Sequence, residues 1–147
     1  MPFARSTIRA RRRRSAAEVA VFAEAWLALG AAALKLKAMP FEKVMRGRAP
    51  RAAGSLAGGE IDRLVWAVAA ARRRSWLRAM CIESALALRT LLRRRGVAAT
   101  LHYGIRKGAA GELEAHVWLT AGGAILVGGE TAGQFTEVAT FDTPAAA

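Results

Sequence analysis

Three side chains in this sequence, Cys81, His102 and His116, could carry nucleophilic or acid–base chemistry. A cysteine thiolate is a strong nucleophile, and an imidazole is a common base for activating it. Cys81 opens a run, residues 81–95, whose apolar positions recur at helical spacing. At a helix start, unpaired amides and the positive end of the helix dipole would stabilise a thiolate and could hold an oxyanion. A buried structural cysteine is the alternative that the residues alone leave open.

Both histidines fall in stretches where apolar and polar residues alternate, 100–105 and 114–120, and this alternation predicts two strands. His116 shares its strand face with Trp118, whose ring can shield an imidazole from water. A histidine on a strand is more often an ordinary hydrogen-bonded residue, so spacing does not decide which imidazole serves the cysteine. One cysteine and two histidines form no recognised ligand set, and we therefore expect no metal.

The elements that must position these side chains follow one another in an α+β order, helices first and an antiparallel sheet afterwards. Helical periodicity covers residues 16–38 and a stretch that starts at Glu60, and residues 46–59 are predicted as a loop. Strands are expected at residues 100–105, 114–120, 124–127 and 135–141. We expect one domain over 16–141, made of a helical part (16–72) and a catalytic part (75–141). Basic residues 1–15 and residues 142–147 are expected to be tails.

Several of these runs together resemble a known family. They are Cys-Ile-Glu-Ser-Ala-Leu-Ala-Leu from Cys81, Leu-Leu-Arg-Arg-Arg-Gly-Val-Ala-Ala-Thr-Leu over 91–101, and Ala-His-Val-Trp over 115–118, followed by a Gly-Gly pair. The chain resembles the transglutaminase-like leader peptidases of lasso-peptide biosynthesis, the B proteins, in their split, stand-alone form. Met-Pro-Phe-Glu-Lys-Val over 39–44 is similar to that family's helical part. The resemblance implies a papain-like fold with Cys81 as nucleophile on a helix and His116 as base on a strand, and it gives His102 no catalytic role.

The family also implies an acid that orients the imidazole, usually an Asp on or just after the next strand. Here that stretch reads Ala-Ile-Leu-Val-Gly-Gly-Glu-Thr over 124–131, and Glu130 is the candidate. A three-residue turn centred on Gly122 would pair His116 with Gly128 and bring Glu130 to the same face. A two-residue turn would place Glu130 on the other face. An unaided Cys–His dyad is the alternative.

The resemblance implies a cysteine peptidase that removes the leader from a ribosomally made precursor, before or with macrolactam ring closure. Its partners would be the precursor, a small leader-binding recognition protein and a cyclase related to asparagine synthetases. Gly54, Gly58 and Gly59 do not have the spacing of a phosphate-binding loop, so no cofactor is expected and any ATP would be used by the cyclase. Two alternatives are an acyltransferase of the same fold and a non-catalytic basic module that binds or chaperones peptides.

Charge and composition limit the partners and the compartment. The chain has 23 Lys and Arg against 11 Asp and Glu, a net charge of +12, so it should attract acidic peptides or an anionic surface. Aromatic and basic residues do not interleave as in nucleic-acid binding proteins, so no nucleic acid is expected; the arginines also fit simple solvated helix faces.

A single cysteine fits a reducing compartment, and we expect a cytoplasmic protein. The longest uncharged stretch near the N-terminus, 25–34, is too short to span a bilayer, which leaves at most peripheral membrane contact.

Overall fold

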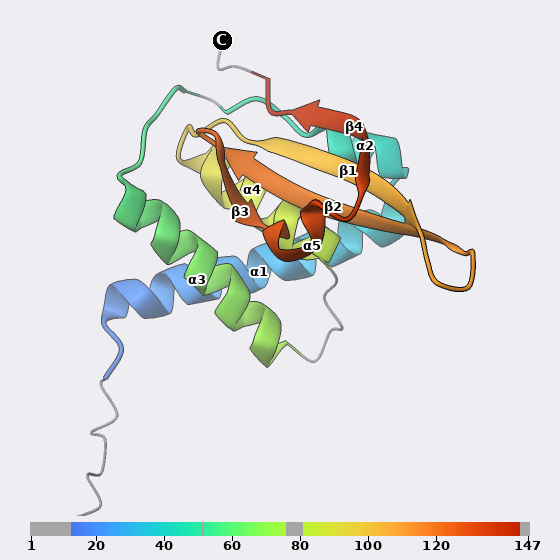
Figure 1. The fold of residues 1–147 in the computed structure, drawn as a ribbon. Helices are drawn as coiled ribbons and strands as arrows, with labels where there is room; N and C mark the ends of the chain where they lie inside the picture. Colours follow the sequence, from blue (N-terminus) through green and yellow to red (C-terminus); the bar gives the residue numbers. More distant parts are fainter. Residues whose placement is uncertain (1–12, 51, 76–80, 145–147) are drawn as a thin grey trace, which may run out of the picture.

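The computed structural model describes residues 13–50, 52–75 and 81–144, with helices in the first part of the chain and a sheet in the second (Figure 1). The predicted α+β class is confirmed, and Cys81 lies on a helix. The described elements are α1 (Ala16–Ala38), α2 (Phe41–Arg46), α3 (Gly58–Arg74), α4 (Cys81–Arg94), β1 (Thr100–Lys107), β2 (Leu113–Ala121), β3 (Ala124–Val127), α5 (Gly129–Ala132) and β4 (Thr136–Asp142).

Helix α1 begins and ends where local chemistry directs it to. The Ser15 side chain accepts from the Glu18 amide and the Glu18 carboxylate accepts from the Ser15 amide, a capping box that satisfies two free donors. Pro40 follows the extended residue Met39 and cannot continue the helix. By length and composition alone, α1 is long and apolar enough to cross a membrane. The core helices of globular proteins and signal sequences can have the same length and composition. In this fold one of its faces is buried, through Ala25, Ala28, Leu29 and Ala32.

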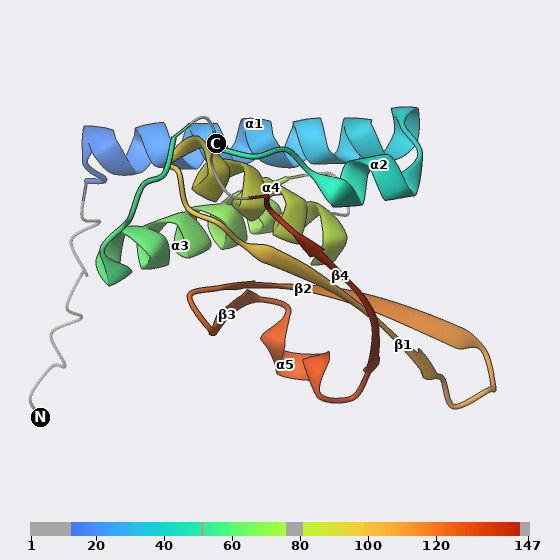
Figure 2. The same cartoon turned by 90° about the horizontal axis from the view of Figure 1, so that it is seen from above.

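The described elements stack in layers, with α1 outermost, α3 and α4 beneath it, and the sheet on the other side of α4 (Figure 2). The apolar positions that recur in residues 81–95 lie on the buried side of α4: Ala85, Leu88 and Leu92 are fully buried, and Cys81 at its start is half-buried. The core continues onto the sheet through Leu101, Val117 and Leu119. This packing fixes the position of α4, and therefore of Cys81, relative to the sheet.

The sheet is antiparallel with the strand order β3-β2-β1-β4. Gly122 and Gly123 form a two-residue turn, both with positive φ, so that Ala121 pairs with Ala124. The register between β1 and β2 places His102 opposite Trp118 and Gly104 opposite His116. Both histidines and Trp118 therefore share one face of the sheet.

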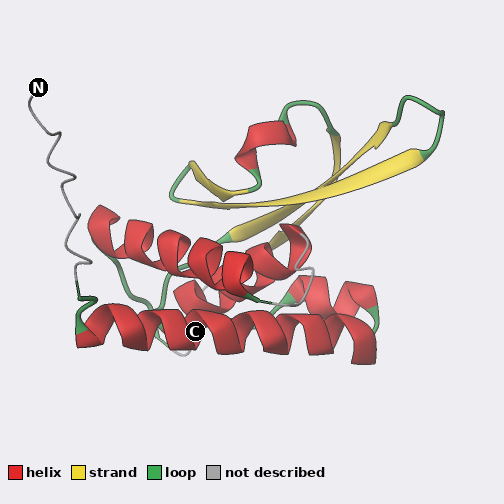
Figure 3. Cartoon of the chain, turned by 90° about the horizontal axis from the view of Figure 1, so that it is seen from below, coloured by secondary structure: helices red, strands yellow, loops and turns green. Residues whose placement is uncertain are grey.

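Two short helices were not expected from the sequence. Helix α2 follows Pro40 directly, and α5 lies between β3 and β4 on the side of the sheet away from the helical layers (Figure 3). Helix α3 starts at Gly58, inside the predicted loop, where the Glu60 carboxylate accepts from the Ala57 amide. The predicted tails fall mostly outside the description, which omits residues 1–12 and 145–147.

Candidate functional site

Cys81 and His116, which are far apart in the sequence, line a single cavity. The cavity measures about 690 Å³ and lies between the last turns of α3, the first turn of α4 and the segment from β3 to α5. Its walls are apolar on α3 and β3, and Arg72 and Arg73 add positive charge at the end of α3. Its described lining is Val65, Val68, Ala69, Arg72, Arg73, Ser75, Cys81, Ser84, His116, Leu126, Val127, Gly128 and Glu130.

Cys81 is a free, half-buried thiol and the first residue of α4. Its place at the helix N-terminus agrees with the position predicted for a nucleophile, because the amides of the first turn have no acceptor within the helix. Ser84 lies one turn further on, on the same side of α4, and its hydroxyl is buried without a hydrogen-bond partner in the described part of the chain. The start of α4 thus offers the cavity a thiol, main-chain donors that have no acceptor within the helix, and one hydroxyl.

The His116 imidazole is held by the main chain. Its Nε2 lies 2.7 Å from the carbonyl oxygen of Gly128. A carbonyl oxygen can only accept, so Nε2 must carry a proton and donate it. In the neutral ring the lone pair is therefore on Nδ1, which is the nitrogen able to act as a base. The Thr131 hydroxyl is a weaker second partner of Nε2, at 3.3 Å.

The conformation of Gly128 makes this contact possible. Its φ of 79° is in the left-handed region, and a Cβ there would lie 2.7 Å from the Val117 carbonyl oxygen. Any larger residue would have to move away from β2, because such a distance is far inside van der Waals contact. A glycine at 128 is therefore required for its carbonyl to reach the imidazole.

The His116 ring also packs near two aromatic rings. The Trp118 ring centroid is 6.0 Å from it at an interplanar angle of 24°, and the Phe135 centroid is 5.0 Å away at 31°. Gly104 leaves space for both, since a Cβ there would come within 2.8 Å of Trp118 and 2.9 Å of Phe135. These flat contacts restrict rotation of the imidazole and shield it from water, as expected for Trp118.

His102 has a different environment, and it is not among the described residues that line the cavity. Its Nδ1 is 2.6 Å from a Glu137 carboxylate oxygen and its Nε2 is 2.8 Å from the Thr120 hydroxyl. The ring stacks almost parallel on Trp118, at 5.3 Å and 4°. Both nitrogens are therefore engaged, and the ring packs against Trp118.

Glu130 lines the cavity too, but it belongs to α5 and not to a strand. The turn before it is the two-residue turn, and a bulge between Leu119 and Thr120 then resets the register so that Leu119 pairs with Val127. The three-residue turn considered for this hairpin is therefore wrong, and strand parity does not decide where Glu130 points. The described hydrogen bonds of Nε2 go to Gly128 and Thr131. The role of Glu130 as orienting acid stays a prediction.

Comparison with known protein families assigns the chain to a superfamily. The family model described as the transglutaminase-like superfamily matches residues 25–140, which include most of α1, helices α2 to α4 with Cys81, and nearly all of the sheet. The chain belongs to this superfamily. Comparison with curated proteins and with solved structures gave no match. The superfamily includes cysteine peptidases and acyltransferases, so membership supports cysteine-dependent chemistry in general.

In this transglutaminase-like domain, two of the contacts that hold the imidazole, with Gly128 and Phe135, were not predicted from the sequence. Gly128 acts through its carbonyl, and Phe135 lies beyond residues 124–131, where the orienting acid was expected. The one available signal was the Gly-Gly pair at 128–129 directly after a strand, which indicates a sharp change of direction. Within the described residues, no group of three or more His, Cys, Asp or Glu could hold a metal ion.

Replacing Glu130 with glutamine is expected to lower kcat less than tenfold. The Nε2 proton is donated to the Gly128 carbonyl, so the carboxylate is not needed to fix the tautomer. In a serine triad, loss of the orienting acid lowers kcat by about 10⁴-fold. The kcat of Glu130→Gln is measured by steady-state kinetics on the same substrate as that of His116→Ala. A loss as large as that of His116→Ala would make Glu130 the third member of a triad and contradict this expectation.

Proposed function

We propose that this chain is a cysteine peptidase that removes the leader from a ribosomally made lasso-peptide precursor, before or with ring closure by a partner cyclase. The observation that carries the proposal is the placement of the His116 ring. Its Nε2–H donates to the Gly128 carbonyl, and the Cys81 thiol lines the same cavity. That arrangement leaves Nδ1 as the base for Cys81. The resemblance of the runs around Cys81 and His116 to the leader peptidases narrows the substrate class.

The proposed reaction has two stages. The Cys81 sulfur attacks the carbonyl carbon at the leader–core junction, and the first amides of α4 stabilise the oxyanion. His116 takes the thiol proton and passes it to the departing amine, so that the core peptide leaves and the leader remains as a thioester. His116 then removes a proton from water, which attacks the thioester carbonyl. The carbon–sulfur bond breaks, His116 returns the proton to the Cys81 sulfur, and the leader is released as a carboxylic acid.

The walls of the cavity suit a peptide. Val65, Val68 and Leu126 offer apolar contact, and Arg72 and Arg73 can receive acidic side chains next to the scissile bond. The described residues are largely committed to the layers that hold Cys81 and His116. We propose that a separate recognition protein holds the leader and raises its effective concentration at this cavity to about the millimolar range.

Isotope incorporation separates this proposal from its alternatives. The precursor is incubated with the enzyme and its recognition protein in ¹⁸O-labelled water, and the products are identified by mass spectrometry. A peptidase is expected to give a free core and a leader whose new carboxylate carries one ¹⁸O atom. An acyltransferase would give a leader joined to an amine, without the label. An uncleaved precursor and no Cys81 thioester would leave only the non-catalytic peptide-binding module.

A further inference from the structure

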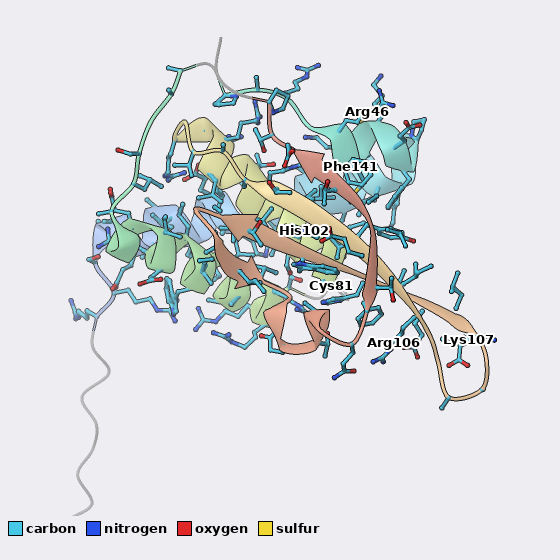
Figure 4. All side chains as sticks on the ribbon, turned by 45° about the horizontal axis from the view of Figure 1, so that its top comes forward. Arg46, Cys81, His102, Arg106, Lys107 and Phe141 are labelled. Carbon is cyan, nitrogen blue, oxygen red and sulfur yellow. The ribbon has the colours of Figure 1, made fainter. Side chains whose placement is uncertain are left out.

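A second cavity, of about 770 Å³, lies between α1, α2 and α4 and shares no described lining residue with the first. We call it the basic groove. Figure 4 labels Arg46, one of its lining residues, on α2 and away from Cys81. Its basic lining consists of Arg89 on the wall and of Lys35, Lys43, Arg46, Arg48, Arg93 and Arg94 around it. No acidic residue is among its described lining, so the groove holds a concentrated positive charge.

Arg89 is the most unusual of these residues because it is buried, with 7% of its surface exposed. Its guanidinium donates to the main-chain carbonyls of Val44, at 2.7 Å, and Met45. Burial lowers the pKa of Arg89 to about 10, and the like charge of Arg93 acts in the same direction. Carbonyl oxygens satisfy donors but do not neutralise a charge, so a buried arginine without a carboxylate partner favours an anion beside it.

The residues around Arg89 leave most of that charge uncompensated. Ion pairs join Arg46 to Glu42, both exposed, and the exposed Arg94 to the half-buried Glu24. For Lys35, Lys43, Arg48 and Arg93, no ion pair with another described residue is found. Charges of one sign that face a common hollow repel one another and attract an oppositely charged ligand strongly.

The groove is also apolar on its α1 side. Leu27 lines it and is 65% exposed, and Leu34, two turns further along the same face of α1, is 67% exposed. Large apolar side chains exposed along one helix face, here two turns apart, mark a contact surface. A ligand for this groove must therefore offer apolar groups as well as negative charge.

We propose that the basic groove binds an acidic, partly apolar segment of a protein partner. Such a segment would place carboxylates near Arg89 and the surrounding cations and lay apolar side chains on Leu27 and Leu34. An anionic membrane has the same two chemistries, but a flat bilayer surface cannot reach a 7% exposed guanidinium on the wall of a hollow. A nucleic acid lacks the apolar component, and no aromatic ring for stacking is among the described lining.

The test uses the full chain carrying Cys81→Ala, so that binding is measured whether or not the protein is a peptidase. The probe is a fluorescent helical peptide with glutamate on one face and leucine beside it, and its comparison peptide has glutamine in place of every glutamate. Binding is followed by anisotropy. We expect the glutamate peptide to bind at least tenfold more tightly than the glutamine peptide, with an affinity that falls as salt is added.

The groove variant is Lys43→Glu/Arg93→Glu, and its matched control is Arg63→Glu/Lys107→Glu, which changes the net charge equally at exposed positions outside the groove. The groove variant is expected to bind the glutamate peptide at least tenfold more weakly, and the control to bind within about twofold of the parent. Lys35→Glu/Lys43→Glu provides a second groove variant if circular dichroism shows that the first is unfolded. Equal binding by groove variant and control would overturn the proposal. So would groove-dependent binding of phosphatidylglycerol vesicles without binding of the peptide, which would assign the surface to a membrane.

Discussion

Replacing Cys81 with alanine is expected to abolish leader removal while leaving the fold intact. The proposed reaction passes through a thioester on this sulfur, and alanine has no atom that can replace it. The side chain is half-buried at the edge of the cavity and makes no disulfide, so its loss should destabilise the protein by about 1 kcal/mol or less. Mass spectrometry of the precursor after long incubation measures the residual cleavage, and circular dichroism with thermal melting measures the fold.

Cys81→Ser is the matched variant for this experiment. A serine hydroxyl has nearly the same shape but is a much weaker nucleophile without a fully organised base, so a loss of several orders of magnitude is expected here as well. Trapping with an activated acyl substrate should label the parent protein at Cys81 and neither variant. Normal cleavage by Cys81→Ala would refute the peptidase proposal and return Cys81 to a structural role.

Helical periodicity predicted the long helices and the position of Cys81 because their burial follows the 3.6-residue repeat. Ala85, Leu88 and Leu92 are fully buried on the side that the pattern indicated. Helices α2 and α5 were not predicted, since elements of 6 and 4 residues are too short to show a repeat. Their positions depend on tertiary contacts, which are not visible in a window of sequence.

In the candidate site too, some features were visible in the sequence and others depend on the fold. Residue type indicated Cys81 and the two histidines, the family resemblance favoured His116 over His102, and the structure places Cys81 and His116 in the lining of one cavity. The contact that fixes the imidazole could not be identified in that way, because any residue has a carbonyl and Gly128 contributes nothing else. The bulge between Leu119 and Thr120 made Glu130 equally hard to place, since one extra residue in a ladder reverses every argument from strand parity.

Replacing His116 with alanine is expected to be nearly as damaging as replacing Cys81. Nδ1 of this ring is the proposed base in the first stage and the proposed base for water in the second, so both stages lose their proton carrier. In the best-studied serine hydrolase, removing either the nucleophile or the base lowers kcat by about 10⁶-fold. The kcat of a cysteine enzyme should fall somewhat less, because a thiol ionises more easily than a hydroxyl. Added imidazole should restore part of the activity of His116→Ala, and iodoacetamide should alkylate Cys81 more slowly in this variant at neutral pH.

The matched control is His102→Phe, which keeps a flat ring on Trp118 and removes both ring nitrogens. Because the His102 nitrogens are engaged by Glu137 and Thr120 and its ring does not line the cavity in the described structure, activity should remain within about tenfold of the parent. His102→Ala should be worse than His102→Phe, since it leaves Trp118 unsupported and loosens the ring beside His116. If His102→Phe proved as inactive as His116→Ala, and imidazole rescued it, the two histidines would have to exchange their assigned roles.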